Sequence, residues 1–383
     1  MRIPLLLAAL VATPALAACT QNATVKTGDD RTILVTSTDD ACDVSPLDAP
    51  SGTLTFEVTN DGSEVTEFYL YAEDGQRILG EVENVGPKLS RELTVSVAPG
   101  TYVTACKPGM KGTGIRADFT VSDSGAKVAA QSDDEQIAHA TEEYQEWVQD
   151  ESGQLLAQTK AFVAAYTSGD DRKAKALYPV ARTHWERIET VAESFGDLDP
   201  KMDAREADLE PGQKWTGWHR LEKDLWPARA GKYAALTMKE RATYADDLLA
   251  DTVTLDGRIK DLEFTVDQIA NGSRALMEEV ATGKVTGEEE YWSRTDLWDF
   301  QANVEGARKA FELLEPVLGQ KDPELEETLD ERFDDLQELL DEQKVGDGFK
   351  TYDQLTPQEV KKLADAVNAV SEPLSQLTAA VLS

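Results

Sequence analysis

The fold class is decided where one residue pattern gives way to another, in the stretch IRADFTVSDSGAKVAAQSDDEQIAHATEEYQEWV, residues 115–148. Residues 115–121 alternate apolar and polar side chains, which is typical of a β-strand with one buried face. Residues 122–134 are small, polar and poor in apolar side chains, and they predict a linker. Beyond them, Tyr144 and Val148 begin an apolar series at helical spacing. The chain is therefore expected to change from strands to helices here.

The part of the chain before the linker predicts a small β-sandwich. Asn60-Asp61-Gly62 and Asp74-Gly75 are turn signals that separate short strand-like segments. Besides residues 115–121, such segments lie at residues 31–36, 52–59, 66–71 and 91–97. About seven strands in roughly ninety residues are typical of a sandwich of two sheets.

The part after the linker predicts an all-α helical bundle. Asp322-Pro323 and Thr356-Pro357 each combine a capping side chain with a proline in the first helical turn. Apolar residues then recur in steps of three and four, at Leu325, Leu329, Phe333, Leu336 and Leu340, and at Leu363, Val367, Val370, Leu374 and Leu377. Stripes of this kind form the core between packed helices.

Charge and the N-terminus limit the possible partners and the location of the protein. The formal net charge is −34, which argues against nucleic acid and anionic membrane surfaces as partners. Residues 1–18 are typical of an export signal, with Arg2, a short apolar run and small residues ahead of Cys19. The apolar run is too short to span a bilayer. We therefore expect an exported protein.

Leu16-Ala17-Ala18-Cys19 resembles a bacterial lipobox, in which the cysteine carries lipid, and residues 19–30 would then be a polar tether. The chain has three cysteines, so acylation of Cys19 leaves Cys42 and Cys106 as an even pair. Ordinary signal cleavage is the alternative, and it would leave an unpaired thiol. The count favours a lipid-anchored protein in the periplasm or on the outer face of the cytoplasmic membrane.

The strongest chemical signal is a His-x-x-Glu motif that places His219 and Glu222 on one face of a helix. Glu186 and Glu189 repeat this spacing upstream, and Asp203 lies in the turn-rich segment between the two helical pieces. One imidazole and several carboxylates, brought together by two helices and a loop, would make a cation site. The alternative is chance, because 72 acidic residues produce such pairs on many solvated helix faces.

The motif belongs to the longer segment WTGWHRLEKDLW, residues 215–226, which resembles the imelysin-like family. The segments SFGDLDP, residues 194–200, and TDLWDFQANVEGA, residues 295–307, extend the resemblance to EfeO-type components of iron-uptake systems. Such proteins carry a cupredoxin-like domain ahead of the imelysin-like domain. The resemblance therefore implies a cupredoxin-like β-sandwich over residues 31–122, a linker over 123–134 and an all-α imelysin-like bundle over 135–383.

The resemblance also implies a function without catalysis. An EfeO-type protein would capture iron outside the cytoplasm and pass it to an inner-membrane iron permease, with a haem-dependent peroxidase as a second partner. Ferrous or ferric iron is the expected cargo, and zinc or copper is left open. Glu279 is a further candidate ligand, from another helix, although it could equally be a solvated charge beside Lys284 or Arg274.

The cupredoxin-like domain cannot hold a blue-copper centre, because the first histidine of the chain is His139 and that centre needs two histidines. Cys106 and Met110 lie on the loop that would carry copper ligands, and Glu67 lies near the position of a first histidine. Two interpretations follow. Cys42 and Cys106 form a structural disulfide, or they form a soft-metal or redox site with Met110 and Glu67.

A metallopeptidase and a polysaccharide-binding protein are the two alternative function classes. A metallopeptidase of the inverted zincin type needs His-x-x-Glu-His, but Lys223 follows Glu222, and the chain has three histidines in all. A cell-surface protein that binds polysaccharide could use Trp215, Trp218 and Trp292 as stacking platforms, although tryptophans are more often core residues.

Overall fold

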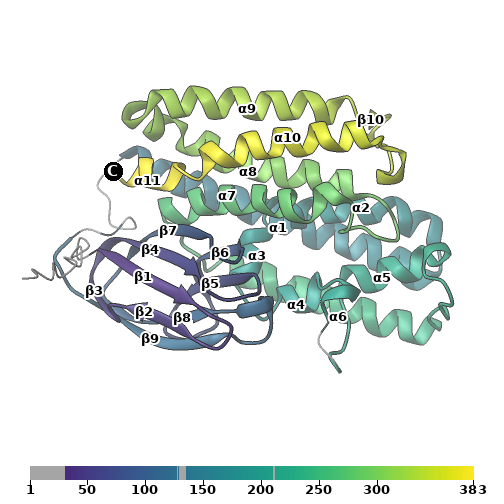
Figure 1. Cartoon of the computed structure of the whole chain (residues 1–383). Helices are drawn as coiled ribbons and strands as arrows, with labels where there is room; N and C mark the ends of the chain where they lie inside the picture. The colour runs from purple at the N-terminus through teal and green to yellow at the C-terminus, as the bar shows by residue number, and fades with distance from the viewer. Residues whose placement is uncertain (1–30, 127, 129–134, 210–211) are drawn as a thin grey trace, which may run out of the picture.

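The computed structural model describes residues 31–126, 128, 135–209 and 212–383. The helices form most of the molecule, with a short hairpin of β10 Lys344–Val345 and β11 Gly348–Phe349 among them, and the other strands lie together at one side (Figure 1). Their bounds are β1 Thr32–Ser37, β2 Cys42–Ser45, β3 Asp48–Pro50, β4 Gly52–Asn60, β5 Thr66–Tyr71, β6 Ile78–Val85, β7 Ser90–Val97, β8 Gly100–Cys106 and β9 Ile115–Ser122. The predicted export signal, the polar tether and Cys19 lie outside the described residues.

The strands form a β-sandwich, as predicted. One sheet has the order β2-β1-β4-β7 and the other has the order β3-β9-β8-β5-β6. β4 alternates buried residues with half-buried or exposed ones along its length because one of its faces covers the core. Phe56 of this strand contacts Phe68 and Phe119 of the other sheet, with ring centroids 5.2 and 5.4 Å apart. Strands β2, β3, β6 and β8 lie outside the segments predicted from the sequence, and Cys106 ends β8 where a loop was expected. Strand β6 carries Glu81 and Glu83 where a core strand would be apolar.

The helical part begins with α1 Glu135–Ser168 and α2 Asp171–Arg187, which pack against each other. The remaining helices are α3 Glu189–Glu193, α4 Asp199–Met202, α5 Trp218–Leu225, α6 Met238–Ile259, α7 Val266–Thr282, α8 Asp296–Lys321, α9 Pro323–Asp341, α10 Pro357–Leu374 and α11 Leu377–Leu382. The bundle prediction is confirmed, and both apolar stripes are buried as expected. Asp322 caps α9 by accepting a hydrogen bond from the Leu325 backbone, and Thr356 caps α10 with a capping box.

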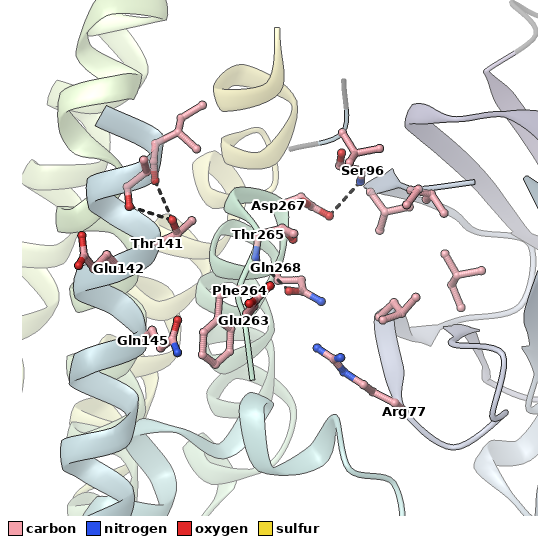
Figure 2. Close-up of a pocket in the computed structure, with 18 of the residues that line it drawn as sticks. Arg77, Ser96, Thr141, Glu142, Gln145, Glu263, Phe264, Thr265, Asp267 and Gln268 are labelled. Atoms are coloured by element: carbon pink, nitrogen blue, oxygen red, sulfur yellow. Dashed lines mark hydrogen bonds between the residues drawn. The ribbon is translucent and has the colours of Figure 1, made fainter. Parts of the chain in front are cut away.

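Helix α7 attaches the bundle to the sandwich. Asp267 accepts a hydrogen bond of 2.9 Å from the Ser96 backbone, and Figure 2 shows this contact beside a cavity of about 600 Å³ between α1, α7 and the strands. Asn271 donates to the Thr94 carbonyl at 2.9 Å, and Arg91 pairs with Glu278 at 2.5 Å. The two domains are therefore joined by specific polar contacts.

Among residues 31–126, 128, 135–209 and 212–383, none of the helices combines the length and the apolar character needed to cross a bilayer.

Candidate metal centre

Helix α5 carries the His-x-x-Glu motif, and a glycine holds it in place. Gly217 precedes the helix with φ +85°, and a Cβ at this position would overlap the carbonyl of Met202. This close approach sets α5 against the end of α4, where Asp203 is the C-terminal cap. The conformation and the contact both require glycine. His219 and Asp203 are neighbours as a result, with Nε2 and Oδ1 3.4 Å apart.

The His219 ring is fully buried among carboxylates. Its Nδ1 lies 3.2 Å from Glu222 and 3.9 Å from Glu290, and its Nε2 lies 3.2 Å from Glu289. Burial lowers the pKa of His219, but hydrogen bonds to Glu222 and Glu289 and the charge of Asp203 outweigh it and raise the pKa to about 10. The ring is therefore an imidazolium, and a metal ion that binds it must displace a proton.

Glu186 and Glu189 converge on one ammonium group. The expectation that both lie on one helix is wrong, because the backbone leaves helical geometry at Ile188, so that Glu186 lies in the last turn of α2 and Glu189 begins α3. Both side chains nevertheless meet at Lys284, whose Nζ lies 2.7 Å from Glu186 and 2.6 Å from Glu189. Asn303 of α8 also donates to Glu189 at 2.8 Å.

Arg182 lies at the middle of the cluster and is fully buried. Its guanidinium pairs with Glu186, one turn along α2, and with Asp203. It also lies 2.7 Å from Glu290, 3.5 Å from Glu289 and 3.4 Å from Asp299. The planar fork of donors can serve several carboxylates at once, which makes Arg182 the internal counter-ion of the centre.

The centre holds more acid than base. In the described part of the chain, seven buried carboxylates face Arg182, Lys284 and His219, namely Glu186, Glu189, Asp203, Glu222, Glu289, Glu290 and Asp299. Burial, reinforced by neighbouring carboxylates, raises the pKa of Glu189, Glu290 and Asp299 well above the usual range. These carboxyl groups keep protons that a bound cation could replace.

Three overlapping sets of side chains in the described residues place ligand atoms within 4.8 Å of one another. They are Asp203, His219 and Glu289; His219, Glu222 and Glu290; and Glu186, Glu189 and Asp203. Five of the residues predicted as ligands from the sequence thus lie in one centre.

Sequence reasoning missed Glu289 and Glu290, which lie in the loop that leads to α8. The available signal was the acidic run Glu288-Glu289-Glu290, just ahead of the segment 295–307. This loop also locks Glu222 in place, because the backbone N–H groups of Trp292 and Ser293 donate to its carboxylate at 2.8 and 2.6 Å.

Glu279 and Glu67 lie outside these three sets, in a second acidic cluster where the two domains meet. Burial and the charges of Glu81 and Glu279 of α7 raise the pKa of Glu83 of β6, and Tyr69 donates to both Glu67 and Glu83, at 2.8 and 3.2 Å. Further acids line a cavity of about 310 Å³ beside them, namely Glu81 of β6, Glu193 of α3 and Asp199 of α4. Burial raises the pKa of Glu81 to about 8 and that of Asp199 to about 7.

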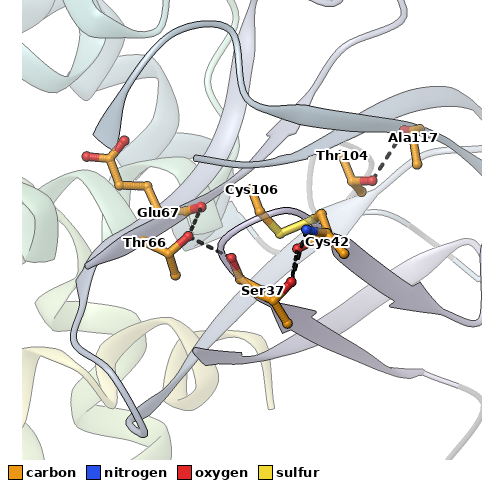
Figure 3. The surroundings of a disulfide bond; sticks show 9 residues. Ser37, Cys42, Thr66, Glu67, Thr104, Cys106 and Ala117 are labelled. Atoms are coloured by element: carbon orange, nitrogen blue, oxygen red, sulfur yellow. Dashed lines mark hydrogen bonds between the residues drawn. A yellow bond between two sulfur atoms is a disulfide. The ribbon is translucent and has the colours of Figure 1, made fainter. Parts of the chain in front are cut away.

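Cys42 and Cys106 are joined by a disulfide, with Cα atoms 5.6 Å apart (Figure 3). Both sulfur atoms are therefore engaged. The Glu67 carboxylate points away from the disulfide in Figure 3, and Met110 is 50% exposed on the short helix η1 (Pro108–Met110). The structure does not bring these four side chains together as a metal site.

The residues that other function classes would use are occupied elsewhere. Lys223, which replaces the second histidine of a zincin motif, pairs with Glu206. Trp218 and Trp292 are buried, and Trp215 packs against Trp292 with ring centroids 5.5 Å apart. Trp218 is a core residue, Trp292 is buried and Trp215 is half-buried against it, so the three do not form an exposed stacking platform.

Comparison with known proteins places most of the chain in two described families. It matches the imelysin family over residues 140–377 and the cupredoxin-like domain family over residues 6–121. Iron uptake system component EfeO of Escherichia coli O157:H7 is 39% identical over 349 residues, which cover 90% of each protein. The same component of Escherichia coli K12 and of Shigella flexneri is 38% identical over the same share of each chain.

A solved structure also resembles part of the chain. An iron-regulated protein A precursor from Parabacteroides distasonis ATCC 8503 aligns with a TM-score of 0.51 and 14% identity, over 67% of this chain and 96% of that one. At this identity the similarity concerns the fold alone.

Proposed function

This chain belongs to the EfeO family of iron uptake system components, and from that premise we propose that it binds iron outside the cytoplasm and delivers it to a membrane permease. The iron would enter the buried centre around His219. The observation that carries the proposal is the contact of one buried imidazole with the carboxylates of Glu222, Glu289 and Asp203. Bundle cores commonly bind iron with glutamates and a histidine that project from facing helices.

Binding would replace protons by a metal ion. Glu189, Glu290 and Asp299 keep protons because their pKa values are raised, and a di- or trivalent ion would take the place of these protons among the seven carboxyl groups. His219 would lose one proton to become a ligand. Affinity should therefore fall as the pH is lowered, and an affinity that is constant between pH 7 and pH 4 would contradict carboxylate ligation.

Release of the iron to the permease would use the same carboxylate chemistry in reverse. Protonation of the carboxylates, reduction of the metal or docking to a partner would each weaken the site. An iron permease and a haem-dependent peroxidase of the same uptake system are the proposed partners. A lipid on Cys19 would hold the protein near them at the membrane surface.

Calorimetric titration of the metal-stripped protein tests the binding step. The probes are Fe²⁺ without oxygen, Fe³⁺ as citrate, Zn²⁺ and Cu²⁺. His219→Gln and Glu222→Gln should weaken iron binding about 100-fold or more, because loss of a ligand exceeds the 10- to 100-fold cost of losing a residue that supports one.

The chain supplies a matched control in a second histidine–glutamate pair. His184 lies 2.6 Å from Glu151, outside the three ligand sets, and both side chains are partly buried. His184→Gln and Glu151→Gln should leave the affinity unchanged. Equal effects of the two pairs of substitutions would contradict the site.

Uptake of radioactive iron by cells that hold the permease tests delivery. Cells that make only the His219→Gln protein should accumulate iron no faster than cells without the protein. Normal uptake with a variant that no longer binds iron would contradict the hand-off.

A further inference from the structure

Lys284 already places a positive charge in the centre. It begins the short helix η5 (Lys284–Thr286), which lies in the connection between α7 and α8, and its side chain is fully buried. Its ammonium lies 2.7 and 2.6 Å from Glu186 and Glu189, two of the three side chains that form one ligand set with Asp203. The position is thus bounded by carboxylate oxygens, as a metal position would be.

We propose that the Lys284 ammonium occupies a cation position at the set of Glu186, Glu189 and Asp203, which adjoins the His219 sets through Asp203, and leaves the Glu186–Glu189 pair when a metal ion is loaded there. This inference rests on the proposed function. An ammonium and a metal ion cannot both bind the same carboxylate oxygens, because the two positive charges would then be close neighbours and would repel each other strongly in this buried site.

The surroundings of Lys284 favour exchange of its ammonium for a metal. Asn303 lies at the same position, fully buried, and donates to Glu189 and to the Glu186 carbonyl at 2.8 Å each. Its Oδ1 atom has no hydrogen-bond partner among the described residues. A buried amide oxygen without a donor is costly, so the surroundings of the Glu186–Glu189 pair are not fully satisfied while the lysine is present.

The Lys284 side chain is freer to change its position than the Arg182 side chain. Arg182 extends from α2 and is held by carboxylates on several sides. Lys284 extends from a single 3₁₀ turn, its four-carbon side chain is flexible, and the charges of Glu289 and Glu279 also act on it. Glu279, which belongs to the interdomain cluster, is therefore an alternative partner for the ammonium outside the three ligand sets. Arg182 is therefore the permanent counter-ion and Lys284 the exchangeable one.

Chemical labelling of the unmodified protein tests the exchange. An amine-reactive reagent is applied with and without saturating Fe²⁺, in the absence of oxygen, and labelling is read at each lysine by mass spectrometry. Lys284 should be protected without metal and become several-fold more reactive with it. Lys350, which pairs with Glu359 at 3.1 Å, serves as the internal control and should not change.

A variant adds a second measurement. Lys284→Met should bind Fe²⁺ at least about tenfold more tightly, because the competing cation is absent. Lys350→Met removes the same charge elsewhere and should leave the affinity unchanged. If the Lys284 variant does not fold, the labelling of the unmodified protein still decides the question.

The outcomes separate this inference from the proposed function. Absence of Fe²⁺ binding in the unmodified protein would overturn the proposed function itself. Tight Fe²⁺ binding with Lys284 still protected would overturn only the exchange. Weaker binding by Lys284→Met would also overturn it, because the lysine would then support the site.

Discussion

Replacing Arg182 with methionine should lower the free energy of unfolding by about 3–5 kcal/mol. Arg182 is fully buried and pairs with carboxylates of Glu186, Asp203 and Glu290, while Glu289 and Asp299 lie within 3.5 Å. Methionine has a similar length and is apolar, so the main change is the loss of the charge. Removing one partner of a buried ion pair costs about 3–5 kcal/mol, because the remaining charge stays buried and unpaired. Several carboxylates lose their partner here, which places the estimate at the upper end.

Urea unfolding followed by circular dichroism of the helices measures the effect, with the protein stripped of metal at pH 7. Arg308→Met is the matched control, because Arg308 also pairs with several carboxylates, Glu312 at 3.0 Å and Asp334 at 2.8 Å, but is 27% exposed. Exposed pairs contribute up to about 1 kcal/mol, so the control should stay close to the unmodified protein. Equal stability of both variants would refute the view that Arg182 neutralises the centre.

Two further predictions concern the cupredoxin-like domain and its contact with the helices. Burial raises the pKa of Glu81 from 4.5 to about 8, so the carboxyl group holds its proton more tightly in the folded protein than in the unfolded one. The stability that this proton contributes is complete below pH 4.5 and is lost as the pH rises through 8. Glu81→Gln should therefore stabilise the protein at pH 8.5 by as much as about 5 kcal/mol and have no effect near pH 4.5. The exposed Glu73→Gln is the control. A change in the free energy of unfolding that does not depend on pH, or one equal to that of the control, would contradict this reasoning. Replacing Cys42 and Cys106 by serine opens a loop of 64 residues and should cost about 4 kcal/mol. Reductant should lower the stability of the unmodified protein to that of the variant and leave the variant unchanged.

The fold class could be predicted from the sequence because it depends on local periodicity. Alternation in β4 and the apolar stripe of α9 describe which face of each element is buried, whatever it packs against. The pair His219 and Glu222 could be predicted for the same reason, since residues three apart share a helix face. Strand β6 could not be predicted from periodicity because it packs beside helices and carries acids of the interdomain cluster.

The composition of the centre depended on contacts between residues that are distant in the sequence. His219 meets Glu289 across 70 positions, Glu189 meets Lys284 across 95, and Arg182 meets Asp299 across 117. No periodicity in a single helix reports such contacts. Nothing local distinguished Arg182 from the other arginines as the buried counter-ion.

The sequence by itself determined a strand domain, a helical bundle and the helix that carries the histidine motif, because neighbouring residues dictate which side of an element avoids water. Only the tertiary structure decided which acids share one buried space and which cations neutralise them. It placed Glu279 and Glu67 at the domain boundary and Lys284 at the centre. The physical reason is that the free energy of a buried charge depends on every charge around it, and the packing of the whole chain sets those neighbours.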